Sequence, residues 1–254
     1  MLVDGHWQLR VVKVAGAGLL VIAAFALFGS AATPKAAARG AALRYCEVGV
    51  VLQAGVCRTR YFMPGMRVRV PSGGWQGGED SPLEFKLYPP GQALNDNSPA
   101  IRFFLDPRAS TPCTDVRLPV SMTTPSRVLH WMRGNKNMIV SAGQPLTIAG
   151  GVAATSVDLN VRPTAPRCDP ACPNACFDYF LFKAPGAEQK PYGSGPGELI
   201  RLYFARIGPP SHVLMVGTDI GTPRNKNLFA SLNATAAKIL ATLRLPGALP
   251  PKRP

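Results

Sequence analysis

Hydrophobic and polar residues alternate with a period of two in several short runs after residue 60. In MRVRVP (66–71), the apolar side chains fall on one face and two arginines fall on the other. LEFKLY (83–88) repeats this pattern with Leu83, Phe85 and Leu87, and AIRFFLDP (100–107) gives a third run that ends at a proline. Such alternation is typical of a strand with one buried face, so these runs predict strands.

The second half of the chain continues the pattern. Gly150-Gly151 separates two alternating runs within 138–161, which predicts a tight hairpin. Further strands are expected at 177–183, 197–208 and 211–220. Two glycine- and proline-rich segments, 71–82 and 184–197, read as loops.

Two segments have helical spacing. In 123–134, Thr124 is suited to the N-cap, Pro125 to the first turn and Gly134 to the exit. A second stripe of apolar residues recurs over 227–244. We therefore predict an α+β fold: a mostly antiparallel sheet of about seven or eight strands with two flanking helices, plus an N-terminal hydrophobic helix. The expected domains are a signal segment at 1–32, a linker and disulfide loop at 33–59, the α+β domain at 60–245 and a tail at 246–254.

An uncharged apolar run occupies residues 14–32, directly after Arg10 and Lys13. Its length reaches the ~20 residues of a membrane-spanning helix, and the preceding positive charges favour the cytoplasmic side. Small residues at 30–32 also suit cleavage by a signal peptidase. We predict export: the protein is extracytoplasmic, either anchored in the membrane by this single helix or secreted after cleavage.

Every cysteine follows the apolar run: Cys46, Cys57, Cys113, Cys168, Cys172 and Cys176. An even number of cysteines on the exported side predicts disulfides. We expect a Cys46–Cys57 bond that closes a short loop, and a bond from Cys113 to one member of the closely spaced triplet. A zinc site needs four ligands in close pairs and a thioredoxin-like site needs C-x-x-C, so neither a metal nor a redox role is predicted.

The chain carries a net charge of +14. Its lysines and arginines are scattered, and no nucleic-acid-binding signature accompanies them, so we read a generic basic surface and expect no nucleic-acid partner. The expected partners are the membrane, through residues 14–32, and an amphipathic lipid, a wall polymer or an envelope protein. No cofactor is predicted, because phosphate-loop, dinucleotide and metalloprotease motifs are lacking in the sequence.

Aromatic residues provide the candidate ligand site: Trp75, Tyr88 and Tyr192. Glycines flank Trp75, and bare backbone around an indole lets a ligand approach. The competing interpretation is that Trp75 plugs the open end of the sheet. We place the predicted site between the 71–82 and 184–197 loops.

A secreted hydrolase with a non-standard Ser/His/Asp site is the alternative function. Ser194 lies in GSGPG, which departs from the G-x-S-x-G elbow. His212 would act as the base, with Asp219 or Asp158 as its partner. An ordinary histidine on an edge strand explains the same residue, so we expect a non-enzymatic role.

The order of these elements resembles a known group of proteins over about residues 60–245. The resemblance rests on five phrases: YFMPGMRVRVPSGGW, SPLEFKLYPPG, NMIVSAGQPLTIAGGVAATSVDLNV, RLYFARI and LFASLNATAAKILATLRL. They are similar to exported envelope proteins of high-GC Gram-positive bacteria and, more distantly, to the PsbP-like fold and LpqN/LpqT-type lipoproteins. The resemblance implies an antiparallel sheet with flanking helices and an accessory or binding role at the cell envelope. The chain lacks the lipid-bearing cysteine of those lipoproteins, so lipid attachment is not implied.

Overall fold

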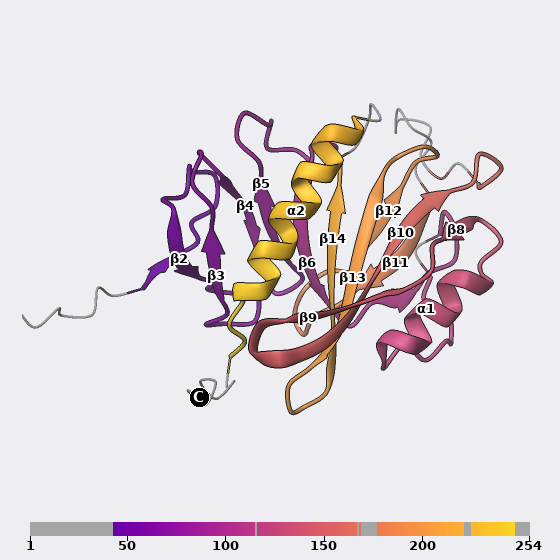
Figure 1. The fold of residues 1–254 in the computed structure, drawn as a ribbon. Coiled ribbons are helices and arrows are strands. Elements are labelled where there is room, and N and C mark those ends of the chain that lie inside the picture. The colour runs from indigo at the N-terminus through magenta and orange to yellow at the C-terminus, as the bar shows by residue number, and fades with distance from the viewer. Residues whose placement is uncertain (1–42, 115, 167, 169–176, 221–224, 247–254) are drawn as a thin grey trace, which may run out of the picture. The chain divides into compact units, whose positions relative to one another are not determined.

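The computed structural model describes residues 43–114, 116–166, 168, 177–220 and 225–246 (Figure 1). The predicted apolar helix at 14–32 and two members of the cysteine triplet, Cys172 and Cys176, lie outside these ranges. Within the ranges, no helix has the length and apolar character needed to cross a membrane.

The main sheet has eight strands, and its paired strands run antiparallel, as predicted. Its path is β4-β5-β6-β14-β13-β10-β8, and β9 pairs with the other end of β10. The strands are β4 (Gln76–Asp80), β5 (Glu84–Tyr88), β6 (Ala100–Leu105), β8 (Met138–Val140), β9 (Gln144–Ile148), β10 (Val152–Val161), β13 (Ile200–Ile207) and β14 (His212–Asp219). A short 3₁₀ turn, η1 (Ala149–Gly151), closes the predicted β9–β10 hairpin, with both of its glycines at positive φ.

Helix α2 (Lys226–Thr242) lies across one face of this sheet (Figure 1). The Asn225 side chain caps it by accepting a hydrogen bond from the Leu228 backbone N–H at 3.0 Å. Leu232, Ile239 and Leu240 are buried against the sheet in one core cluster. Helical spacing in the sequence thus predicted both this helix and its inward face.

A second layer covers the opposite face of the sheet. It contains helix α1 (Pro125–Gly134) and a three-stranded sheet of order β12-β11-β7, made of β7 (Arg108–Ala109), β11 (Phe177–Phe182) and β12 (Lys190–Ser194). The aromatic side chains of β11 pack with apolar residues of the main sheet in a second core cluster. The Thr124 hydroxyl caps α1 by accepting from the Arg127 backbone N–H at 3.3 Å, as predicted.

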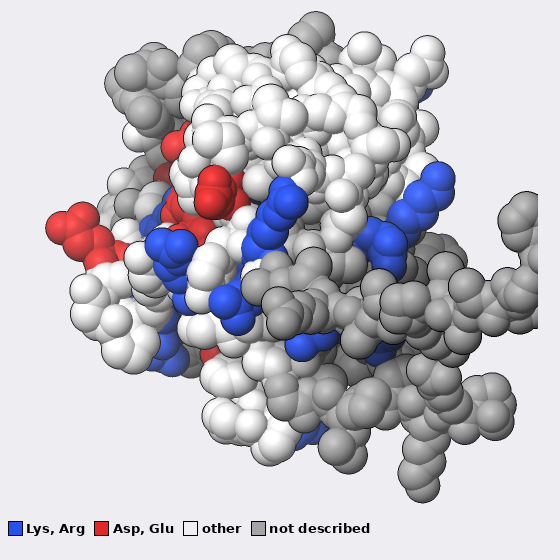
Figure 2. Space-filling model, turned by 90° about the vertical axis from the view of Figure 1, so that its left-hand side faces the viewer, with Lys and Arg blue, Asp and Glu red and all other residues white. Residues whose placement is uncertain are grey.

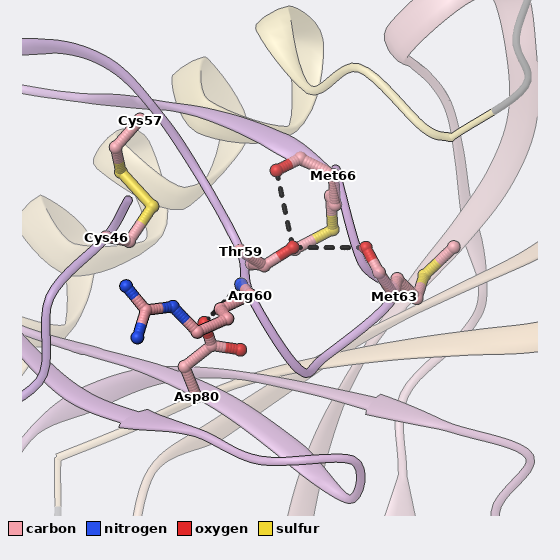
Figure 3. The surroundings of a disulfide bond; sticks show 7 residues. All are labelled: Cys46, Cys57, Thr59, Arg60, Met63, Met66 and Asp80. Carbon is pink, nitrogen blue, oxygen red and sulfur yellow. Dashed lines mark hydrogen bonds between the residues drawn. A yellow bond between two sulfur atoms is a disulfide. The ribbon is translucent and has the colours of Figure 1, made fainter. Parts of the chain in front are cut away.

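A small sheet of order β1-β2-β3 stands beside these layers: β1 (Arg44–Tyr45), β2 (Gly55–Arg58) and β3 (Arg67–Val70). The Cys46–Cys57 disulfide joins its first two segments (Figure 3). The Asp80 carboxylate accepts hydrogen bonds from the backbone N–H groups of residues 60–62 at 2.5–3.1 Å. β2 pairs with β3 through the connection at residues 59–66. Cys46 and Cys57 are buried in the same core cluster as Val68 and Val70, so the disulfide loop packs into the core of the domain.

Two expected loops contain strands. Strand β4 lies within 71–82, and β12 lies within 184–197. Glycine and proline punctuation suggested loops there, but tertiary pairing overrides this local signal: β4 pairs with β5, and β12 pairs with β11. The sequence predicted that only one face of the strand at 83–88 would be buried. This was wrong, because all five residues of β5 are buried.

Candidate functional site

Three adjacent strands place charged side chains on the sheet face that lies opposite α2. Lys86 in β5 pairs in register with Arg102 in β6, and Arg102 pairs with Gly217 in β14. Glu84 and Asp219 lie two residues from these positions on their own strands, so they point to the same face and reach Arg102 diagonally. All four charged residues are buried, with Glu84 at 0% exposure.

Arg102 occupies the centre of this charged network. Its Nε lies 3.0 Å from Asp219 Oδ2, and its Nη1 lies 3.4 Å from Glu84 Oε1. Its Nη2 donates to the backbone carbonyl of Asp96 at 2.5 Å. One guanidinium therefore bridges two buried carboxylates and orders the β5–β6 loop.

Two lysines complete the network. Lys86 Nζ lies 2.6 Å from Asp96 Oδ1 and 3.5 Å from Glu84 Oε1. Lys190 Nζ, from β12, lies 2.6 Å from Glu79 Oε2 and also contacts Glu84 Oε2. The second lysine thereby joins the 184–197 segment to β4, so the two segments expected to flank the ligand site do meet. On the face drawn in Figure 2, basic and acidic side chains lie next to each other.

Burial and charge act against each other in this network. Burial raises the pKa of Glu84 and of Asp219, and their cationic neighbours offset only part of the rise. Burial alone would lower the pKa of Arg102, but the charges of Asp219 and Glu84 outweigh it and raise this pKa, so the guanidinium stays charged. The hydrogen bond from Lys86 lowers the pKa of Asp96.

A polar pocket of about 180 Å³ opens beside the network. Its lining comes from the β5–β6 loop, β6, β11, β12, the β12–β13 connection and β14: Asp96, Asn97, Arg102, Asp178, Lys190, Pro191, Tyr192, Gly193, Ser194, Glu198 and Asp219. Tyr192 is 6% exposed, and its buried hydroxyl makes no hydrogen bond of acceptable geometry with any described residue, although it lies beside the Asp219 carboxylate. A Cβ at Gly217 would lie 2.8 Å from this hydroxyl, so the bare backbone there makes room for it.

The structure separates the three aromatic candidates. Tyr192 lines the polar pocket. Tyr88 lies next to the network: its hydroxyl donates to the Asn95 carbonyl at 2.9 Å, and burial raises its pKa to about 12. Trp75 is buried in the core cluster on the α2 side, where it serves packing, the role closest to the plug interpretation.

Ser194 and His212 line different pockets. The Ser194 hydroxyl lies in the polar pocket, 3.4 Å from the Tyr179 hydroxyl. His212 lines an apolar pocket of about 450 Å³, and its Nδ1 lies 2.6 Å from Asp106 Oδ2. Asp219 pairs with Arg102, and Asp158 pairs with Arg201 at 2.7 and 2.9 Å. These pairings assemble no Ser/His/Asp triad among the described residues.

Both expected disulfides are present: Cys46–Cys57 and Cys113–Cys168. They fit an oxidising, extracytoplasmic compartment. Across the described part of the chain, no group of three or more metal-ligating side chains comes together.

Comparison with known proteins leaves the chain without an assigned family. No protein-family model matches it, and no curated protein matches it.

Sequence reasoning missed the central charged residues of the pocket region, Glu84, Lys86 and Arg102. Alternation in 83–88 is the same for a strand whose polar face meets water and for one whose charges pair inside the protein. One signal pointed to the second case. Apart from Asp178, the FDYFLF run of β11 is apolar on both faces, so it needs a covering layer on each side.

Proposed function

We propose that this protein is an exported, non-enzymatic binding protein of the cell envelope, and that its polar pocket receives one polar unit of a wall polymer. Residues 14–32 would deliver the domain across the membrane or tether it there. The proposal follows from the resemblance to exported envelope proteins and from the pocket itself.

The observation that carries the proposal is the polar pocket itself, where charged side chains of several strands and Tyr192, with its hydroxyl beside the Asp219 carboxylate, line one cavity. Hydrogen bonds to charged groups contribute about 1.5–3 kcal/mol each, so a polar ligand that bonds to this lining gains free energy there. The network around Arg102 already fixes the neighbouring side chains, so the pocket is preorganised.

The size and polarity of this pocket favour one of the expected ligands. The pocket volume of about 180 Å³ is below the ~300–1,000 Å³ of ordinary small-molecule sites. It therefore suits a single sugar or amino-acid unit. An acyl chain would have to lie against charged side chains and would gain little from burial there, so this polar pocket fits a wall polymer better than an amphipathic lipid.

Co-sedimentation of the full chain with purified insoluble peptidoglycan tests the proposal. We expect the wild-type protein to sediment with the polymer and Tyr192→Phe, which removes only the hydroxyl, to sediment less. Tyr203→Phe is the matched control, because Tyr203 lies in the α2-side core on the opposite face of the sheet. Equal sedimentation of the wild type and Tyr192→Phe, or no sedimentation of either, would overturn the proposal.

A further inference from the structure

The loop closed by the Cys46–Cys57 disulfide carries a large share of the exposed apolar side chains. Eight large apolar side chains are exposed in the described part of the chain, and four of them lie in this loop: Val48, Val50, Val51 and Val56. Their exposed fractions are 39–63%. Single exposed valines are ordinary, but four of them within one short loop form a patch of the kind that marks an interaction surface.

The backbone of this loop is fixed, so the valines do not belong to a loose segment. The Gly49 N–H donates to the Gly77 carbonyl at 2.8 Å, and the Leu52 N–H donates to the Trp75 carbonyl at 2.7 Å. These bonds attach the loop to the start of β4, at the edge of the main sheet. The Leu52 side chain is buried in the core cluster, and the side chain of Val51 points outward, because side chains alternate along an extended segment.

Arginines lie on the outer face of the small sheet that holds the loop. In the pairing of β2 with β3, Val56 lies opposite Arg69, and Arg58 lies opposite Arg67. Directly paired residues share a face of a sheet, and the other face, which includes Cys57, packs in the core. The outer face therefore combines one valine of the loop with three arginines. This face and the four valines together are called the β1–β3 surface.

Charge is one-sided in this part of the chain. Residues 43–78 contain one acidic residue, Glu47, and five basic ones: Arg44, Arg58, Arg60, Arg67 and Arg69. None of these arginines forms an ion pair among the described residues. Figure 2 faces the side of the molecule that carries β1–β3, and its acidic side chains gather mainly at the left while basic ones extend across the view. The arginine charges are therefore available to an external anion.

We propose that the β1–β3 surface docks on a lipid bilayer that contains anionic lipids. The valines enter the boundary between headgroups and acyl chains, and the arginines bind the lipid phosphates, since interfacial binding adds buried apolar area to attraction by anionic headgroups. A nucleic acid or an acidic polymer would use the arginines but leave the valines in water. None of the residues of this surface lines the polar pocket, so the inference goes beyond the function proposed above.

The place of the surface along the chain supports a bilayer as the partner. Leu43, the first described residue, is separated from the predicted apolar run at 14–32 by residues 33–42. A connection of this length spans at most about 36 Å when fully extended. An apolar run that is retained would hold the surface near the bilayer, and a cleaved form would depend on the surface alone.

Co-sedimentation of residues 33–254 with lipid vesicles tests the proposal. This form lacks the apolar run, which would itself bind vesicles, and it keeps every described element and both core clusters. One set of vesicles contains phosphatidylcholine alone, and the other contains equal parts of phosphatidylcholine and phosphatidylglycerol. We expect at least about tenfold tighter binding to the anionic vesicles, because each arginine near an anionic surface contributes about fivefold.

Two pairs of substitutions separate the contributions of charge and apolar area. Arg67→Gln combined with Arg69→Gln should weaken binding to the anionic vesicles about tenfold or more. Val48→Ser combined with Val51→Ser should weaken it about fivefold or more, because less apolar surface enters the bilayer. All four side chains are exposed, so no core contact is lost.

Matched controls make the same changes elsewhere. Arg127→Gln combined with Arg133→Gln removes two exposed arginines of α1. Val116→Ser combined with Ile139→Ser removes two exposed apolar side chains outside the surface. Each control should bind nearly as tightly as the wild type, since charges beyond the screening length of about 10 Å contribute little.

Several outcomes contradict the proposal. Equal binding to both kinds of vesicle, no binding to either, or a control that lowers binding as much as its matching surface pair would overturn it. An effect of the arginine pair alone would mean that the surface binds polyanions through charge, and an effect of the valine pair alone would mean a partner without anionic groups. Tyr192→Phe should leave vesicle binding unchanged, so this result is distinguishable from the outcome of peptidoglycan sedimentation.

Discussion

Replacement of Arg102 by methionine should destabilise the protein strongly, because it leaves Glu84 and Asp219 buried without their shared cation. Removing one partner of a buried ion pair costs about 3–5 kcal/mol. Methionine retains much of the apolar stem, so the loss comes mainly from charge. With about 2–4 °C per kcal/mol in a domain of this size, Tm should fall by about 6–20 °C.

Arg201→Met provides the matched control. Arg201 also forms a close ion pair, with Asp158, but the two side chains are 35% and 42% exposed. Exposed pairs contribute about 0–1 kcal/mol, since water and salt screen them. Both variants remove one arginine from a strand of the same sheet, so the difference between them measures the effect of burial.

Urea denaturation of the full chain under non-reducing conditions, at pH 7 and at pH 5, is the assay. Burial raises the pKa of Glu84 and Asp219, so protonation at pH 5 should remove the buried negative charge that Arg102 no longer neutralises and reduce the deficit of Arg102→Met relative to the wild type. The reasoning is refuted if Arg102→Met costs no more than Arg201→Met at pH 7, or if its deficit grows on acidification.

Three further changes test other parts of the fold. Gly217→Ala should cost about 1–3 kcal/mol in thermal denaturation, because its Cβ would meet the Tyr192 hydroxyl at 2.8 Å; a gain, as expected for alanine in an open strand, would contradict this contact. Removing the Cys46–Cys57 disulfide by a double alanine substitution should cost about 2.8 kcal/mol for a separation of 11 residues, measured by urea denaturation, and an unchanged midpoint would count against its role. Asn233→Ala should cost about 1–3 kcal/mol despite better helix propensity, because two buried hydroxyls lose their partner; higher stability would show that these bonds contribute nothing.

Local patterns predicted most of the elements. The period of two identified the strands that became β3, β5, β6, β13 and β14, and the Thr124–Pro125 pair gave the start of α1. These features depend on residues close in sequence, so the sequence alone is sufficient. Strands β4 and β12 escaped prediction because glycine and proline weaken their own propensity, and only their pairing partners make them strands.

The site was predictable in part for the same reason. The meeting of the 71–82 and 184–197 segments was anticipated, and the Lys190–Glu79 contact joins those segments. The role of Arg102 depends on the register of three strands that are distant in sequence, β5, β6 and β14. No local pattern encodes that register, so its central position was visible only in the fold.

The position of β14 has a consequence for how the chain reaches its final form. This strand lies between β6 and β13, so it joins the part of the sheet built from residues 76–105 to the part built from residues 138–207. Synthesis supplies both parts before it supplies residues 212–219. Until then, each part presents an unpaired strand edge that can pair with another molecule. A chain that stops short of residue 219 therefore carries two strand edges open to pairing, and the main sheet closes only after nearly all of the domain has been synthesised.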